Sequence, residues 1–150
     1  MTVPRILGGA CVTSYLLAMC LPSITYQNSV LRGWELAYTC GQLSFAQSMD
    51  LGDRAPFIFG TLSNLLFLCG ITFFLGRTFW RWSWPHDIAI CLISVACLIF
   101  SMFCASFAAL WQSPLLVGFY LWILSPILLL LGSLNKCWRQ WTVTVLDDPK

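Results

Sequence analysis

The chain alternates between long apolar runs without charge and shorter segments that hold all of its charged residues. Four such runs cover residues 6–24, 56–76, 88–110 and 114–134, and none contains Asp, Glu, Lys, Arg or His. About 20 residues of helix cross a hydrocarbon core, and backbone groups in lipid must find their hydrogen-bond partners within the protein. The pattern predicts an all-α polytopic membrane protein with four transmembrane helices in two hairpins.

The segments between the runs divide one transmembrane domain, residues 1–150, into an outer loop (25–55), a cytoplasmic loop (77–87) and a cytoplasmic tail (135–150). Pro56 and Pro114 open the second and fourth runs, and the first helical turn tolerates proline because its N–H groups have no helical partner. The two prolines therefore predict where those helices begin.

The outer loop contains an amphipathic pattern with helical spacing, formed by Leu31, Trp34, Tyr38, Phe45 and Met49. It predicts an interfacial helix whose aromatic side chains rest in the headgroup region of the bilayer. An alternative is a lid over the bundle or a docking surface, in which case Trp34, Tyr38 and Phe45 are the candidate outer surface for a partner.

The positions of Lys and Arg predict the orientation of the chain. Six of the eight Lys and Arg residues fall on one side of the membrane if the spans alternate, and Arg32 and Arg54 fall on the other. Cytoplasmic loops carry an excess of these residues, so both termini are expected in the cytoplasm. Arg5, the following apolar run and Cys20 are also compatible with a cleaved signal, but the bulky Met19 and the spanning length favour retention.

Composition supports a lipid environment for the chain. It has 150 residues, of which 59% are hydrophobic and 9% charged, against about 25% charged in an average soluble domain. The net charge of +2 gives no reason to expect nucleic acid binding. The lipid bilayer is therefore the first expected partner, joined by a membrane protein or a second copy of the chain.

Small residues follow helical spacing in two of the predicted spans. The first span has Ala10, Ser14 and Ala18, and the third has a longer series: Ser94, Cys97, Ser101, Cys104 and Ala108. Small side chains let transmembrane helices approach closely, which makes both series predicted packing faces. The alternative is a narrow polar path lined by Ser and Cys.

Two further features lie within the predicted spans. Asn64 is the most polar side chain at mid-membrane depth, and it needs a hydrogen-bond partner because an unpaired carboxamide in lipid is costly. A neighbouring Ser or Thr is the expected partner, with ligand coordination as the alternative. Pro126 removes a backbone hydrogen bond within the fourth span and predicts a kink, with Ser125 beside it to satisfy freed groups.

The chain has eight cysteines, no Cys-x-x-Cys pair and a single histidine. A zinc site is therefore not predicted, and we expect no metal or cofactor. Cys20 and Cys40 both fall toward the outer side and are the candidate disulfide, although spacing alone does not establish their pairing.

The function expected from these residues is helix packing against a partner protein. Proton relays and ion-coupled transporters use ionisable residues at depth, and these spans contain none. The single His86, beside Asp87, does not complete a catalytic constellation. We therefore expect a non-enzymatic protein that acts through helix packing with a partner, as an accessory subunit or an immunity-type protein. The alternative is a passive channel or small-solute carrier built around Asn64, Ser94, Ser101 and Pro126.

Three short motifs in the first half of the chain, Leu21-Pro22, Gly33-Trp34-Glu35 and Ala55-Pro56, resemble a class of small, uncharacterised bacterial four-helix inner-membrane proteins. Those proteins often have Trp and Asn just before the second proline, where this chain has Asp53-Arg54-Ala55. The resemblance implies a bacterial inner membrane and no particular activity.

Overall fold

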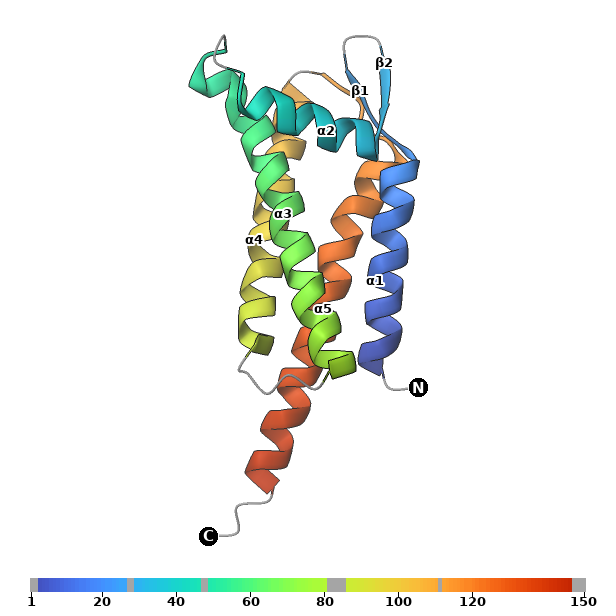
Figure 1. Cartoon of the computed structure of the whole chain (residues 1–150), viewed down its shortest axis with the longest axis vertical. Helices are drawn as coiled ribbons and strands as arrows, with labels where there is room; N and C mark the ends of the chain where they lie inside the picture. The colour runs from blue at the N-terminus through green and yellow to red at the C-terminus, as the bar shows by residue number, and fades with distance from the viewer. Residues whose placement is uncertain (1–2, 27–28, 47–48, 81–85, 111, 147–150) are drawn as a thin grey trace.

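The computed structural model describes residues 3–26, 29–46, 49–80, 86–110 and 112–146. In order along the chain, they form α1 (Val3–Cys20), β1 (Pro22–Tyr26), β2 (Ser29–Arg32), α2 (Gly33–Ser44), α3 (Leu51–Trp80), α4 (His86–Leu110) and α5 (Val117–Leu146). Figure 1 shows α1, α3, α4 and α5 running lengthwise as a bundle. The helix α2 and the β1–β2 hairpin lie across one end of this bundle (Figure 1), which we call the capped end.

Three of the helices have the length and composition of membrane spans. Their apolar stretches are Leu51–Gly76 in α3, Asp87–Leu110 in α4 and Val117–Trp138 in α5, whereas the apolar part of α1, Arg5–Cys20, is shorter. The 18 residues of α1 extend about 27 Å at the helical rise of about 1.5 Å per residue, slightly less than a hydrocarbon core of about 30 Å. The prediction of a membrane protein is confirmed, while a fourth span remains a prediction.

The bundle is held by three main helix interfaces, α1 with α5, α3 with α4, and α4 with α5. Its buried core draws on all four long helices and consists of Cys11, Phe67, Ile71, Phe74, Ile90, Cys97 and Leu129. Aromatic side chains join α1 to α3, where the ring of Tyr15 stacks on that of Phe67 with their centroids 4.5 Å apart.

The hairpin corrects the prediction that only helices follow the first span. The helix α1 ends at Cys20 and does not reach residue 24, because the residue before a proline, here Leu21, is disfavoured in the helical conformation. From Pro22 the chain is extended and pairs antiparallel with β2, Thr25 opposite Val30.

The connection between α4 and α5 also pairs with strand β1. Its residue Leu115 forms a bridge with Ile24, and the N–H of Leu116 donates to the carbonyl of Ser23 at 2.9 Å. Just before it, Gln112 has a left-handed φ of 52°. There the N–H of Ser113 bonds back to the carbonyl of Ala108 at 2.9 Å, which satisfies an orphan carbonyl of the last turn of α4.

Both prolines expected at helix starts lie elsewhere. The helix α3 already begins at Leu51, so that Pro56 lies inside it, and α5 begins at Val117, after Pro114. Pro114 lies in the connection before α5, where its missing N–H costs no helical bond, and its carbonyl accepts the N–H of Thr25 at 3.4 Å. Pro56 lies in the second turn of α3, so that its missing N–H affects only a bond to the first turn.

The amphipathic helix expected in the outer loop is present as α2. The carboxylate of Glu35 in its first turn accepts the backbone N–H of Arg32 at 2.7 Å, which satisfies a backbone donor at the helix start. The N–H of Gly33 donates to the carbonyl of Leu21 at 3.1 Å. These bonds connect α2 directly to the end of the hairpin and to the end of α1.

Two glycines allow the cap to lie close to the bundle. A Cβ atom at Gly33 would collide with the backbone carbonyl of Ala18, and one at Gly118 would lie 2.7 Å from the carbonyl oxygens of Leu21 and Pro22. Real Cβ atoms do not approach backbone so closely. Only glycine at these positions lets α2 rest on α1 and α5 rest on β1.

We expect Gly33→Ala to destabilise the protein by about 2 kcal/mol or more, because the new methyl group displaces α2 from the end of α1. The matched control is Gly41→Ala in the same helix, where an added Cβ meets nothing within 4 Å. The control should be neutral or gain up to about 1 kcal/mol from helix propensity. Unfolding of detergent-solubilised protein followed by tryptophan fluorescence measures both, and equal stability of the two variants would contradict the packing described.

Candidate functional site

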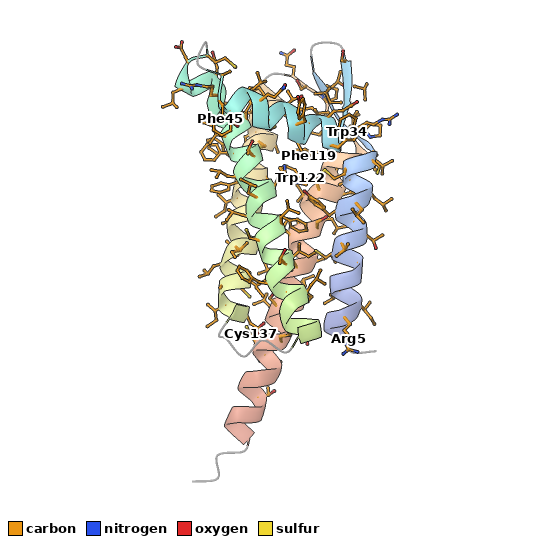
Figure 2. The ribbon with its side chains drawn as sticks, in the orientation of Figure 1. Arg5, Trp34, Phe45, Phe119, Trp122 and Cys137 are labelled. Carbon is orange, nitrogen blue, oxygen red and sulfur yellow. The ribbon has the colours of Figure 1, made fainter. Side chains whose placement is uncertain are left out.

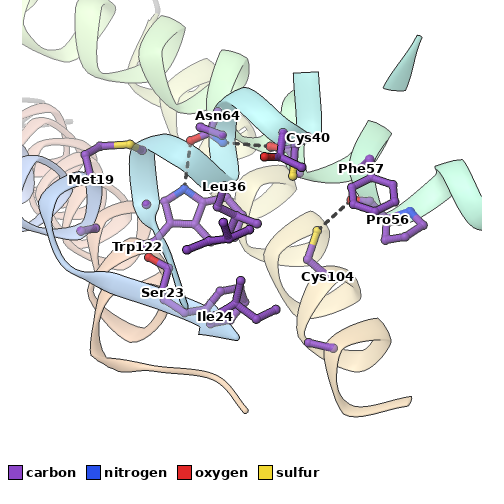
Figure 3. Close-up of a pocket in the computed structure, with 18 of the residues that line it drawn as sticks. Met19, Ser23, Ile24, Leu36, Cys40, Pro56, Phe57, Asn64, Cys104 and Trp122 are labelled. Carbon is purple, nitrogen blue, oxygen red and sulfur yellow. Dashed lines mark hydrogen bonds between the residues drawn. The ribbon is translucent and has the colours of Figure 1, made fainter. Parts of the chain in front are cut away.

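A cavity of about 70 Å³ lies beneath α2 at the capped end. Every helix and both strands contribute to its wall, from Met19 at the end of α1 to Trp122 in α5. Figure 3 shows Leu36 and Cys40 of α2 facing Cys104 and Trp122 across this space. The helix α2 therefore covers the cavity, as a lid would.

The wall of the cavity is largely apolar and carries no charged side chain among the described residues. Three phenylalanines, Phe57, Phe107 and Phe119, are part of this wall. Burying an unpaired charge in such surroundings is strongly unfavourable. The site is therefore suited to neutral groups and unsuited to ions.

Asn64 is the polar centre of the cavity wall and ties three helices together. Its Oδ1 accepts the hydroxyl of Tyr15 from α1 and the indole Nε1–H of Trp122 from α5, each at 3.1 Å. Its Nδ2 donates to the carbonyl of Gly60, one turn earlier in α3, at 3.1 Å. The predicted structural hydrogen bond is thus present, but the partners are aromatic side chains rather than Ser or Thr.

Tyr15 and Trp122 were missed by the sequence analysis, although one signal pointed to them. Buried tyrosine and tryptophan normally find a partner for their O–H or N–H, and both residues lie within uncharged runs. Asn64 is the most polar side chain available to them at that depth. Pairing the three required knowledge of how α1, α3 and α5 are arranged.

Two cysteines lie where α2 meets the bundle. A Cβ at Gly60 would be 3.1 Å from Sγ of Cys40, so the thiol rests directly on the α3 backbone. Burial raises the pKa of Cys40 to about 12, because the thiolate would lose its hydration there. On the other side, the thiol of Cys104 donates to the carbonyl of Pro56 at 3.4 Å.

The predicted disulfide between Cys20 and Cys40 is absent, and both cysteines are free. Cys20 is exposed at the end of α1, whereas Cys40 is buried against α3. Cys40 lies on the side of α2 that faces the bundle, with its thiol against Gly60 of α3.

Most of the small residues singled out in α4, namely Ser94, Cys97, Ser101 and Ala108, are buried. The Ser63 hydroxyl lies 3.2 Å from that of Ser101, and the thiol of Cys97 donates to the carbonyl of Ser63 at 3.5 Å. Ser94 donates to the carbonyl of Ile90 in its own helix at 2.8 Å. Of the predicted series, Cys104 and Ala108 reach the cavity, whereas the other members seal α4 against its neighbours.

The small-residue face of α1 is shifted from the predicted one. Ser14 and Ala18 are buried but Ala10 is exposed, and Cys11 takes its place. The Cys11 thiol donates to the carbonyl of Ser125 at 3.2 Å, and the Ser14 hydroxyl to the carbonyl of Leu121 at 3.0 Å. These bonds reach the turn of α5 that precedes Pro126, so this buried proline belongs to the α1–α5 interface and not to the cavity.

The aromatic residues expected on the outer surface of α2 point away from the cavity. Trp34 is 54% exposed, Tyr38 63% and Phe45 81%, and Figure 2 shows Trp34 and Phe45 toward opposite ends of the helix. They are therefore available to lipid headgroups or to a partner.

The side chain of His86 lies outside the described residues, while Asp87 is buried in the first turn of α4. Within the described ranges, no three His, Cys, Asp or Glu side chains form a group that could hold a metal ion.

We expect Asn64→Leu to lower the free energy of unfolding by about 1–3 kcal/mol, because it leaves the Tyr15 hydroxyl and the Trp122 indole N–H without an acceptor. The control is Thr72→Val, which removes an exposed hydroxyl bonded only to its own helix at the Leu68 carbonyl. That change should cost less than about 0.5 kcal/mol. Reversible unfolding by SDS in mixed micelles compares the two variants. A loss at Asn64 no larger than that at Thr72 would refute its role as the node of three helices.

Comparisons with protein-family models, with curated proteins and with solved structures found no match to this chain. The likeness of its short motifs to small bacterial inner-membrane proteins stays a prediction. Any function must therefore be argued from the cavity, the helix faces and the surface of α2.

Proposed function

We propose that this chain is a non-catalytic membrane protein that crosses the bacterial inner membrane four times and acts by contact with another membrane protein. An accessory subunit or an immunity-type protein has this character. The proposal is supported by a cavity wall that has no charged side chain among the described residues and by one side of α1 that is exposed along its length. The second of these observations carries the argument.

The exposed side of α1 has the composition of a helix-packing face. Its members recur every three or four residues and are Ile6, Gly9, Ala10, Thr13, Leu16, Leu17 and Cys20, all exposed. A Cβ built at Gly9 meets no atom within 4 Å. Glycine lowers the stability of a helix interior, whereas a small residue lets a second transmembrane helix approach closely. The small residues on this side are accounted for if a partner helix packs there.

The other small-residue faces are already used within the chain. Ser94, Cys97 and Ser101 are buried among α4 and its neighbours, and Ser14 and Ala18 are buried on the other side of α1. The contact with a partner is therefore assigned to the outer side of α1. The exposed Trp34 of α2, near the end of α1 in Figure 2, extends this surface at the capped end.

A passive channel or small-solute carrier has weaker support. The hydroxyls of Ser94 and Ser101 donate to carbonyls of their own helix at 2.8 Å, and Pro126 belongs to a different helix interface. These residues do not line a shared path with Asn64. No observation in the described part of the chain favours solute movement over contact.

Cys20 provides a direct test because it lies exposed on the proposed face. We expect a benzophenone maleimide attached to Cys20, in a Cys69→Ala background, to form one discrete protein adduct on irradiation of native membranes. Gly9→Leu should reduce that adduct at least fivefold, because the larger side chain blocks close approach. Leu65→Ala, at an exposed position of α3, is the control and should leave it unchanged. The mass of the adduct distinguishes a second copy from a different protein. Adducts to lipid alone, or an adduct indifferent to Gly9→Leu, would refute the proposal.

We expect reporters at both termini to lie on the cytoplasmic side, since six of the eight Lys and Arg residues fall there if α1 spans the membrane. Fusions active only in the cytoplasm or only in the periplasm, placed at each end, measure this. The same reporters inserted after Gly41 in α2 should give the opposite result. Opposite locations for the two termini would mean that the chain does not cross the bilayer four times.

A further inference from the structure

The protein's own side chains enclose a space beneath α2 without filling it. Empty space in a protein interior is destabilising in proportion to its volume. The chain keeps about 70 Å³ there, and small residues at Ala37 and Ala108 in the wall leave it open. A cavity that larger side chains at these positions would fill is more readily explained by an occupant than by packing.

The polar groups of the wall define what an occupant must offer. Both bonds to Oδ1 of Asn64 are already made by Tyr15 and Trp122. An amide nitrogen has two hydrogens to donate, and among the described residues Nδ2 of Asn64 donates only to Gly60. The amide therefore has a donor to spare but no free acceptor. An occupant bonded to it must accept a hydrogen bond.

The volume of the cavity and the character of its wall narrow the class of possible occupants further. A cavity of about 150 Å³ holds the six non-hydrogen atoms of benzene, so this one suits about three. Because the pocket is open on one side, a slightly longer molecule can extend out of it. The wall contains aromatic rings such as Phe57 and Phe119 and, within the described ranges, no charged side chain to balance an ion. A neutral, mostly apolar molecule fits both conditions.

We propose that the cavity binds a small neutral organic molecule carrying one hydrogen-bond acceptor, such as a short-chain ketone or alcohol, with its oxygen on Nδ2 of Asn64. The helix α2 covers the bound molecule, and Cys40 and Cys104 lie beside it (Figure 3). This assignment is independent of the contact proposed for α1, because the exposed side of α1 does not border the cavity.

The test is photolabelling of the full chain in phosphatidylcholine–phosphatidylglycerol nanodiscs with a diazirine analogue of butanol, followed by peptide mass spectrometry. We expect saturable adducts on wall residues such as Met19, Cys40 and Cys104. Excess 2-butanone should reduce them at least fivefold, whereas pentane, of similar size but without an acceptor, should reduce them less than twofold.

Variants show whether the label occupies this space. Ala37→Leu adds bulk to the wall from α2 and should reduce labelling at least fivefold. Ala109→Leu, at an exposed position of α4, should leave it unchanged, and Ala108→Leu provides a second filled variant if α2 is displaced in the first. Adducts confined to exposed residues such as Leu65 and Leu68, adducts that persist in both filled variants, or equal competition by pentane would each overturn the proposal.

Discussion

The carboxamide of Asn64 is the interaction on which the capped end of the bundle depends. In lipid, no water is present to hydrogen-bond an unpaired amide. Here Oδ1 of Asn64 accepts hydrogen bonds from Tyr15 of α1 and Trp122 of α5, while Nδ2 donates to the Gly60 carbonyl of its own helix. The three helices are thereby held at one depth, directly beneath α2. The amide nitrogen has a second hydrogen to donate, and Asn64 lines the cavity, so that the structural bonds and the proposed binding site share one side chain.

Close approach of backbone is the second constraint, and it acts on the cap. Gly33 lets α2 rest on the end of α1, and Gly118 lets α5 pass β1. Hydrogen bonds from the connection before α5 to Ser23 and Thr25 then bind the hairpin to the bundle. The cap is therefore part of the folded core and not a loop lying on its surface. The cavity lies between this cover and the helices beneath it, where small residues such as Ala37 and Ala108 leave space.

Small residues lie on two sides of α1, one buried and one exposed. Cys11 and Ser14 bond to carbonyls of α5 and bring the two helices together. On the other side, Gly9 and Thr13 are exposed, and a Cβ built at Gly9 would meet no atom within 4 Å. The same residue type thus serves an internal interface and a face open to the bilayer, and only burial distinguishes them.

The sequence by itself determined the apolar helices, an amphipathic helix in the outer loop, and the need of Asn64 for a partner. These follow from local properties: uncharged length, helical spacing and the cost of an unpaired amide. Only the tertiary structure decided that Tyr15 and Trp122 meet Asn64, that Cys11 rather than Ala10 faces α5, and that Pro22 begins a strand paired with a distant connection. Those outcomes depend on the rotation and register of segments far apart in the chain, which no local pattern encodes.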